Sequence, residues 1–141
     1  MALDVLVGGR AALPVATVRR VVRAVIAGER ATSRIAAVSV TFLGPVRMRS
    51  LNRSHLRHDR PTDVIAFALP APDGRLTGDL YLCRAVAARQ ARDAGVPLRQ
   101  ELIRLVIHGT LHLLGRDHPA GEARFRSSMW RRQERYVTEL S

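Results

Sequence analysis

Apolar residues recur along this chain at two spacings, one typical of helices and one typical of strands. Between Pro14 and about Arg30, valines and isoleucines return every three or four positions with arginines between them, which predicts an amphipathic helix. From Ile35 to Leu43 apolar residues alternate, which predicts a β-strand. Further strands are expected at residues 2–7, 62–69 and 76–83, and further helices at 46–56, 84–94, 98–114 and roughly 122–140.

The order of these elements predicts an α+β fold. The strands gather in the first part of the chain and the helices near its end. The stretch PAPDG at residues 70–74 separates two of the strands and is typical of a hairpin turn. No repeat or linker divides the 141 residues, so we expect a single domain, 1–141, with a small mixed β-sheet covered by helices.

The helix expected at residues 98–114 carries one polar stripe on an otherwise apolar surface. Such a helix is typically buried. The stripe holds Glu101, Arg104, His108 and His112, at offsets 0, 3, 7 and 11. Residues four apart lie one turn apart on the same face, so the two imidazoles can bind one metal ion. Gly115 then supplies a residue that can end the helix with a positive φ.

A third histidine, His118, extends this pair into the pattern HGTLHLLGRDH. The turn at Gly115 can bring it back to the same ion, which leaves a fourth tetrahedral position for water. Two alternatives remain open: ordinary core or surface histidines, and a closed structural zinc site with Cys83 as fourth ligand. Gly109 stands where a zinc peptidase of the same spacing carries a glutamate; it either gives a phosphate access to the ion or packs closely against another helix.

Composition adds a preference for polyanionic partners. The chain has 23 basic residues, all arginine, against 12 acidic ones, a formal net charge of +11. Such a field attracts nucleic acid, although solubility alone is an alternative explanation. A single cysteine suits a reducing compartment. We see neither a leader-like N-terminus nor an apolar run of about 18 residues, so we expect a cytoplasmic protein without a membrane span.

Three blocks of the sequence resemble the YbeY family, the bacterial endoribonucleases of ribosomal RNA maturation. The blocks are HGTLHLLGRDH, LNRSHLRHDRPTDVIAF at residues 51–67 and GDLYL at residues 78–82, in the family's order and spacing. The resemblance implies a zinc-dependent, single-strand-specific endoribonuclease that acts in 16S ribosomal RNA maturation and ribosome biogenesis. It implies His108, His112 and His118 as ligands of one Zn²⁺ ion, with single-stranded RNA and the small ribosomal subunit as partners. It leaves the oligomeric state undetermined.

The sequence departs from the family's pattern at its arginine. That position holds Leu56, so we predict Arg57 as the residue that stabilises charge on the phosphate, with Arg53 as an alternative. The aromatic residue that precedes the arginine in the family is His55 here, and the family's serine before phenylalanine is Ala66. The other arginines of this segment are expected to bind the RNA backbone: Arg47, Arg49, Arg53 and Arg60.

Aspartates are candidates for holding the imidazoles in place. We predict Asp117 as an acceptor for an imidazole N–H. Asp63 and Asp79 are further candidates, although hydrogen bonds to local backbone are the favoured interpretation for both.

The absence of a glutamate at position 109 favours RNA over peptide as substrate. Zinc lowers the pKa of its bound water to about 7, so a phosphodiester can be attacked without a dedicated base. A peptidase must also protonate a departing amine. Two alternatives to the endoribonuclease remain: a metal-stabilised ribosome- or RNA-binding factor with little catalysis, and a zinc peptidase.

Overall fold

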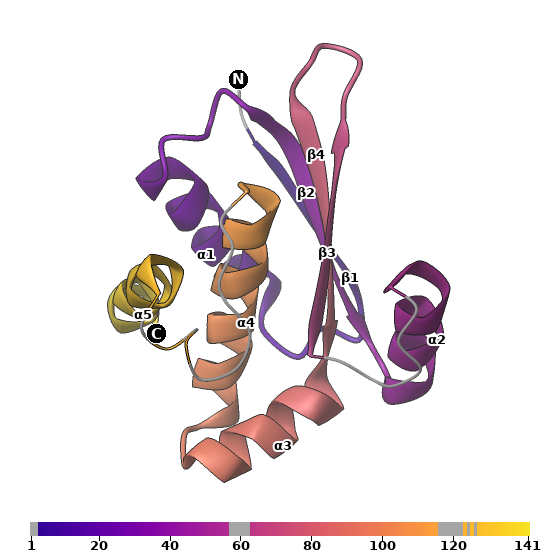
Figure 1. Cartoon of the computed structure of the whole chain (residues 1–141), viewed down its shortest axis with the longest axis vertical. Helices are drawn as coiled ribbons and strands as arrows, with labels where there is room; N and C mark the ends of the chain where they lie inside the picture. Colours follow the sequence, from indigo (N-terminus) through magenta and orange to yellow (C-terminus); the bar gives the residue numbers. More distant parts are fainter. Residues whose placement is uncertain (1–2, 57–62, 116–122, 124, 126) are drawn as a thin grey trace.

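A four-stranded mixed sheet forms the centre of the protein, and helices cover both of its faces (Figure 1). This computed structural model describes residues 3–56, 63–115, 123, 125 and 127–141. The strand order is β1-β2-β4-β3; β1, β2 and β4 run parallel, and β3 pairs antiparallel with β4. The strands are β1 (Asp4–Gly9), β2 (Ile35–Leu43), β3 (Val64–Pro70) and β4 (Leu76–Cys83). The expected α+β class is therefore confirmed.

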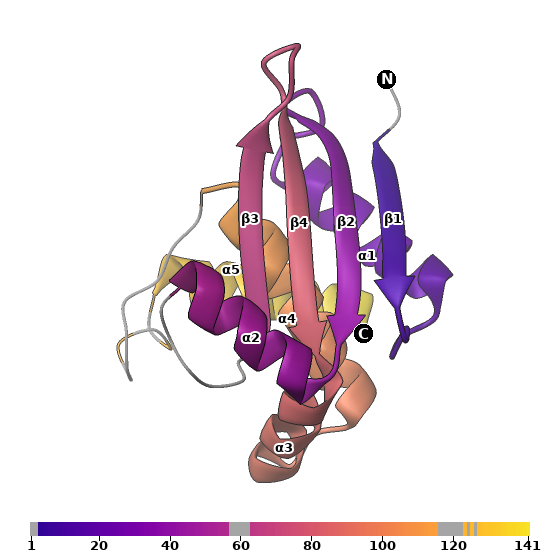
Figure 2. The same cartoon turned by 90° about the vertical axis from the view of Figure 1, so that its right-hand side faces the viewer.

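The helices divide between the two faces of the sheet. Helices α1, α4 and α5 lie on one side, with α4 against the sheet and α5 outside it, whereas α2 crosses the opposite face and α3 extends beyond the end of β4 (Figures 1 and 2). Their bounds are α1 (Val15–Gly28), α2 (Pro45–Leu56), α3 (Arg84–Ala94), α4 (Leu98–Leu113) and α5 (Ser128–Leu140). None of the helices in the described ranges is long and apolar enough to cross a membrane.

The alternation of side chains along β4 supplies two separate cores. Leu80 and Leu82 point to the α1 and α4 side and belong to the main apolar cluster. Cys83 points the other way, where it packs with Met48, Ile65 and Val86 beneath α2. Because β4 is a central strand, the position of α4 is set by side chains that are themselves fully buried.

Most element boundaries agree with the sequence prediction, and the last helix is the main exception. It begins at Ser128 rather than near residue 122, because the Ser127 side chain accepts a hydrogen bond from the Trp130 N–H at 3.1 Å and caps the helix. The predicted hairpin turn is confirmed between β3 and β4, where Gly74 adopts a φ of +85°.

A buried carboxylate ties α5 to α1. The Glu29 side chain is only 2% exposed; it accepts hydrogen bonds from the Tyr136 hydroxyl at 2.7 Å and from Arg132 Nη1 at 3.0 Å. Burial, and then the bond to Glu29, raise the pKa of Tyr136 to about 12. The hydroxyl therefore stays protonated, and able to donate, over the neutral range.

We expect Tyr136→Phe to lower the free energy of unfolding by about 1.5–3 kcal/mol, because it removes a hydrogen bond to a buried charged group. Urea denaturation at neutral pH measures the change. In the wild type this contribution is present below pH 10 and is lost as the pH rises toward 12, where Tyr136 ionises. The variant should lack that loss.

Tyr81→Phe is the matched control, since Tyr81 is the only other tyrosine of the chain. Its hydroxyl makes no hydrogen bond within the described part of the chain, so the expected change is within about 0.5 kcal/mol. Equal losses in the two variants would contradict the role given to the Glu29 contact.

Candidate metal centre

Two histidines meet on one face of α4. The Nε2 atoms of His108 and His112 lie 3.0 Å apart, and the two rings stand edge to face with their centres 4.5 Å apart. Two nitrogen ligands of a tetrahedral zinc ion lie roughly 3.3 Å apart, given Zn–N bonds of about 2.0–2.1 Å. A shift of a few tenths of an ångström therefore suffices for the pair to bind one ion, so these residues fit the predicted metal.

Gln133 of α5 fixes the orientation of the first imidazole. Its side-chain oxygen lies 2.6 Å from His108 Nδ1, and its amide nitrogen donates to Glu134 Oε2 at 3.1 Å. The amide thus presents its oxygen to the ring, so Nδ1 carries the proton and Nε2 keeps its lone pair. His112 Nε2 lies within hydrogen-bond distance of that atom, at 3.0 Å. A histidine that binds a metal through Nε2 needs its proton on Nδ1, and a hydrogen bond from Nδ1–H to an acceptor such as Gln133 keeps it there.

An ion-pair network continues from Gln133 back to α4. Arg104 donates to both carboxylate oxygens of Glu134, at 2.9 and 3.0 Å, and to Glu101 Oε1 at 3.1 Å. The hydrogen bonds with Glu134 raise the pKa of Arg104 against the opposing effect of its burial. The polar stripe predicted from the sequence is therefore one connected network, from Glu101 to the histidine pair.

Gln133 was not among the site residues predicted from the sequence. Helix α5 buries Met129, Tyr136 and Val137 along one face, and Gln133 is the polar exception on that face, with 2% of its surface exposed. A buried amide requires hydrogen-bond partners, so its position in an apolar stripe was a usable signal. The predicted acceptors for the imidazole N–H groups were all aspartates.

Two of those aspartates have other partners. Asp63 accepts hydrogen bonds from its neighbour's backbone, Val64 N–H at 2.7 Å, and from Gln90 Nε2 at 3.1 Å. Asp79 accepts one from the Ser39 hydroxyl at 2.6 Å. The favoured interpretation is thus confirmed for Asp63, whereas the partner of Asp79 is a side chain of the adjacent strand rather than local backbone.

Several predicted site residues lie outside the described residues: His118, Asp117, Arg57 and Arg60. The third metal ligand therefore stays a prediction. Within the described ranges, no group of three or more histidine, cysteine, aspartate or glutamate side chains is arranged to hold a metal ion. Cys83 is buried in the cluster beneath α2, so the described residues give no support to it as a fourth ligand.

The predicted RNA-binding arginines of α2 are separated from the histidines by the sheet. Arg47, Arg49 and Arg53 are exposed on α2, which crosses the face opposite α4 from the end of β2 toward β3 (Figure 2). Helix α4 contacts β3 on the other face. An RNA strand that touches both groups must therefore pass around the β3 edge of the sheet.

Gly109 faces the sheet. A Cβ atom at this position would lie 2.9 Å from Leu80 Cδ2 and 3.1 Å from Val64 Cγ2. Close packing accounts for the glycine, although the partner is the sheet rather than the helix we expected, and no space for a phosphate opens at this point. Gly115 ends the helix as predicted, with a φ of +86°.

The comparisons with known proteins agree with these features. The family model described as Endoribonuclease YbeY matches residues 11–141. A protein named Endoribonuclease YbeY from Chromohalobacter salexigens is 44% identical over 84 residues, which cover 57% of this chain and 54% of that protein. Another of that name, from Burkholderia ambifaria, is 41% identical over 88 residues, or 62% of this chain and 50% of that protein. The chain thus spans about half the length of these relatives.

The fold is shared with a solved structure. The solution structure of TM1509 from Thermotoga maritima superimposes with a TM-score of 0.66 at 28% identity, over 99% of this chain and 89% of that one. The class of protein is thus an α+β domain that carries a histidine pair on a buried central helix. The chain belongs to the YbeY family, as the resemblance of its three blocks predicted.

We expect His108 to be the Nδ1–H tautomer in solution, because Gln133 accepts that proton. Long-range ¹⁵N–¹H correlation spectra of the imidazoles report the tautomer directly. Gln133→Leu should give a mixture of tautomers. Gln90→Leu is the control: Gln90 is on α3 and its amide is bonded to Asp63, so the His108 signals should not change. An Nε2–H tautomer in the unaltered protein would contradict the arrangement.

Proposed function

We propose that this protein is a zinc-dependent, single-strand-specific endoribonuclease that acts in 16S ribosomal RNA maturation and ribosome biogenesis in the cytoplasm. The observation that carries the proposal is the His108–His112 pair, whose Nε2 atoms converge to 3.0 Å in a member of the YbeY family. His118 is the third proposed ligand. Zinc supplies a Lewis acid and a bound water of pKa about 7.

The protein's own residues hold this site and its substrate. Gln133 keeps the lone pair of His108 directed at the ion position, and the Arg104–Glu134 pair keeps Gln133 in place. The net charge of +11 attracts RNA, and the exposed arginines of α2 bind its phosphate backbone independently of the base sequence. We assign to Arg57 the stabilisation of charge on the phosphoryl oxygens, with the small ribosomal subunit as the natural partner.

Two alternative functions differ from this one in a measurable way. A zinc peptidase lacks its general base, because position 109 holds a glycine packed against the sheet. A metal-stabilised ribosome- or RNA-binding factor with little catalysis is favoured by Leu56 at the family's arginine position. The first would cleave protein and the second would cleave nothing.

We expect the purified protein to cleave single-stranded RNA, to leave casein intact, and to lose RNA cleavage when a chelator removes the metal. Electrophoresis of both substrates, with and without chelator, measures all three outcomes. The His108→Ala, His112→Ala double variant should be inactive and contain no zinc by elemental analysis. His118→Ala should only weaken zinc binding, since its position in a turn carries a larger ordering cost than the helical pair.

Stoichiometric zinc in the double variant would contradict the assignment of His108 and His112 as metal ligands. Absence of cleavage of either substrate by the zinc-loaded protein would leave the RNA-binding factor as the function. Chelator-sensitive cleavage of casein would instead identify a peptidase.

We expect Arg57→Ala and Arg60→Ala to differ in kind. The first should reduce the rate of RNA cleavage about 10²-fold or more, as for the loss of one charge-stabilising donor. The second should weaken RNA binding modestly. It should also reduce the slope of the logarithm of affinity against the logarithm of salt concentration by about one. Single-turnover rates and salt titrations separate the two effects. If Arg57→Ala keeps its rate, Arg53→Ala tests the alternative residue in the same assay.

A further inference from the structure

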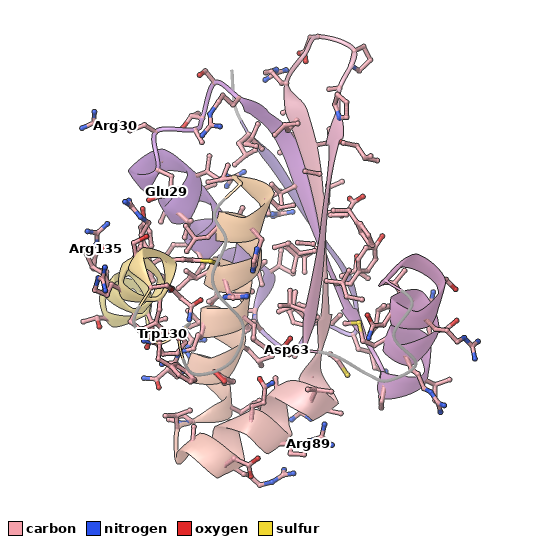
Figure 3. The ribbon with its side chains drawn as sticks, viewed as in Figure 1. Glu29, Arg30, Asp63, Arg89, Trp130 and Arg135 are labelled. Carbon is pink, nitrogen blue, oxygen red and sulfur yellow. The ribbon has the colours of Figure 1, made fainter. Side chains whose placement is uncertain are left out.

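A cavity of about 720 Å³ adjoins His108, between α3, α4 and α5. His108 and Gln133 form part of its wall, so it opens beside the proposed metal position. Trp130 and Asp63 also line it, and Figure 3 places them on either side of α4. The volume falls in the range of sites that bind small organic ligands.

The described residues that line this cavity carry more negative than positive charge, in contrast to the whole protein. They include three carboxylates, those of Asp63, Asp93 and Glu101, and one guanidinium, that of Arg104. That guanidinium is already paired with Glu101 and with Glu134. Although the chain has a net charge of +11, this described part of the cavity wall favours groups that donate hydrogen bonds over phosphate.

Glu101 supplies a buried acceptor that faces the cavity. The residue is 7% exposed, and its Oε1 accepts the bond from Arg104. Its Oε2 accepts no hydrogen bond from any described residue, yet no fully buried side-chain oxygen or nitrogen in the described part of the chain lacks a partner. Oε2 therefore keeps some access to solvent, and Glu101 is one of the residues that line the cavity.

Asp93 adds a second acceptor at the α3 wall. Within the described ranges its carboxylate forms no hydrogen bond or ion pair, in contrast to Asp63, whose two oxygens are both engaged. No group of three or more histidine, cysteine, aspartate or glutamate side chains that could hold a metal ion is found among the described residues. Donors of an organic ligand suit them better than a metal ion.

An aromatic pair forms the wall on the α5 side. The rings of Phe125 and Trp130 meet edge to face, with centres 4.8 Å apart and planes at 86°, and both line the cavity. Phe125 is 46% exposed. Flat aromatic side chains beside hydrogen-bond acceptors are the usual means by which proteins hold an unstacked base of single-stranded RNA.

We propose that this cavity binds one nucleobase of the RNA, the base next to the cleaved phosphate, and that it selects bases with an exocyclic amino group. The ring stacks on Trp130, and the amino group donates to Glu101 and Asp93. Cytosine, adenine and guanine carry such a group. Uracil does not, and its carbonyl oxygens would face the carboxylates. This inference rests on the proposed function and names the part of its substrate that the site selects.

Cytidine and uridine are the matched probes, because they differ only in the amino or carbonyl group at C4 and the adjoining ring proton. Trp130 is the only tryptophan in the chain, so its fluorescence reports binding to the cavity. We expect saturable quenching by cytidine with an affinity about tenfold or more above that for uridine, as for a hydrogen bond to a charged acceptor. The measurement uses nucleosides and requires no cleavage.

Glu101→Gln and Asp93→Asn should each reduce the preference for cytidine several-fold while leaving Trp130 in place as the reporter. Glu139→Gln removes the same charge from an exposed position of α5 that does not line the cavity, so its preference should equal that of the unaltered protein. Asp93 is exposed and unpaired in the described structure, so Asp93→Asn keeps the test valid if Glu101→Gln fails to fold.

The two proposals fail in different experiments. Absence of RNA cleavage together with selective cytidine binding would overturn the endoribonuclease and keep the base site. RNA cleavage together with equal quenching by both nucleosides, or with none, would overturn the base site alone. An unchanged preference in both acidic variants would also overturn it. Mapping of the cuts in RNA of mixed sequence should show an amino-bearing base enriched at one fixed position beside the cut, and Asp93→Asn should lose that enrichment.

Discussion

The ion pair between Arg104 and Glu134 is the contact on which the rest of the site depends. Helix α4 is buried by the sheet and by neighbouring helices, and yet it carries a carboxylate, a guanidinium and two imidazoles along one stripe. Both side chains are partly buried, with 17% and 31% of their surface exposed, so removal of one partner leaves the other charge poorly solvated and without a partner. The bidentate contact therefore docks α5 at one register, and that register also places Gln133 against His108.

Charge is distributed unevenly between the surface and the interior of this protein. The exposed arginines of α2 belong to a strongly positive exterior, whereas three carboxylates and one guanidinium are found among the described residues that line the cavity beside His108. On the proposed function, the base of one nucleotide enters the cavity beside His108, and the arginines of α2 contact the RNA backbone farther along the strand, beyond the β3 edge of the sheet. Such a separation orients a strand without any reading of its sequence at other positions.

Local sequence signals and tertiary contacts account for different parts of the structure. The bounds of β2, β4 and α3, and the stacking of His108 on His112, follow from periodicities within one element, so they could be predicted. The contact between Gln133 and His108 joins two helices across 25 residues, and no local pattern encodes it. The contact between Gly109 and the sheet could not be predicted either, because it depends on how α4 packs against Leu80.

The close approach at Gly109 has a consequence for the descent of metal-dependent enzymes. Position 109 is the place of the catalytic glutamate in zinc peptidases of the same histidine spacing. Here a Cβ atom at this position would lie closer to Leu80 and Val64 than van der Waals contact allows, at 2.9 and 3.1 Å. A glutamate gained there by mutation would bury a carboxylate among apolar side chains instead of presenting a base to water. A single substitution at position 109 therefore would not convert this site into that of a zinc peptidase, although the histidine spacing is the same. Strands β3 and β4 would first have to move away from the helix.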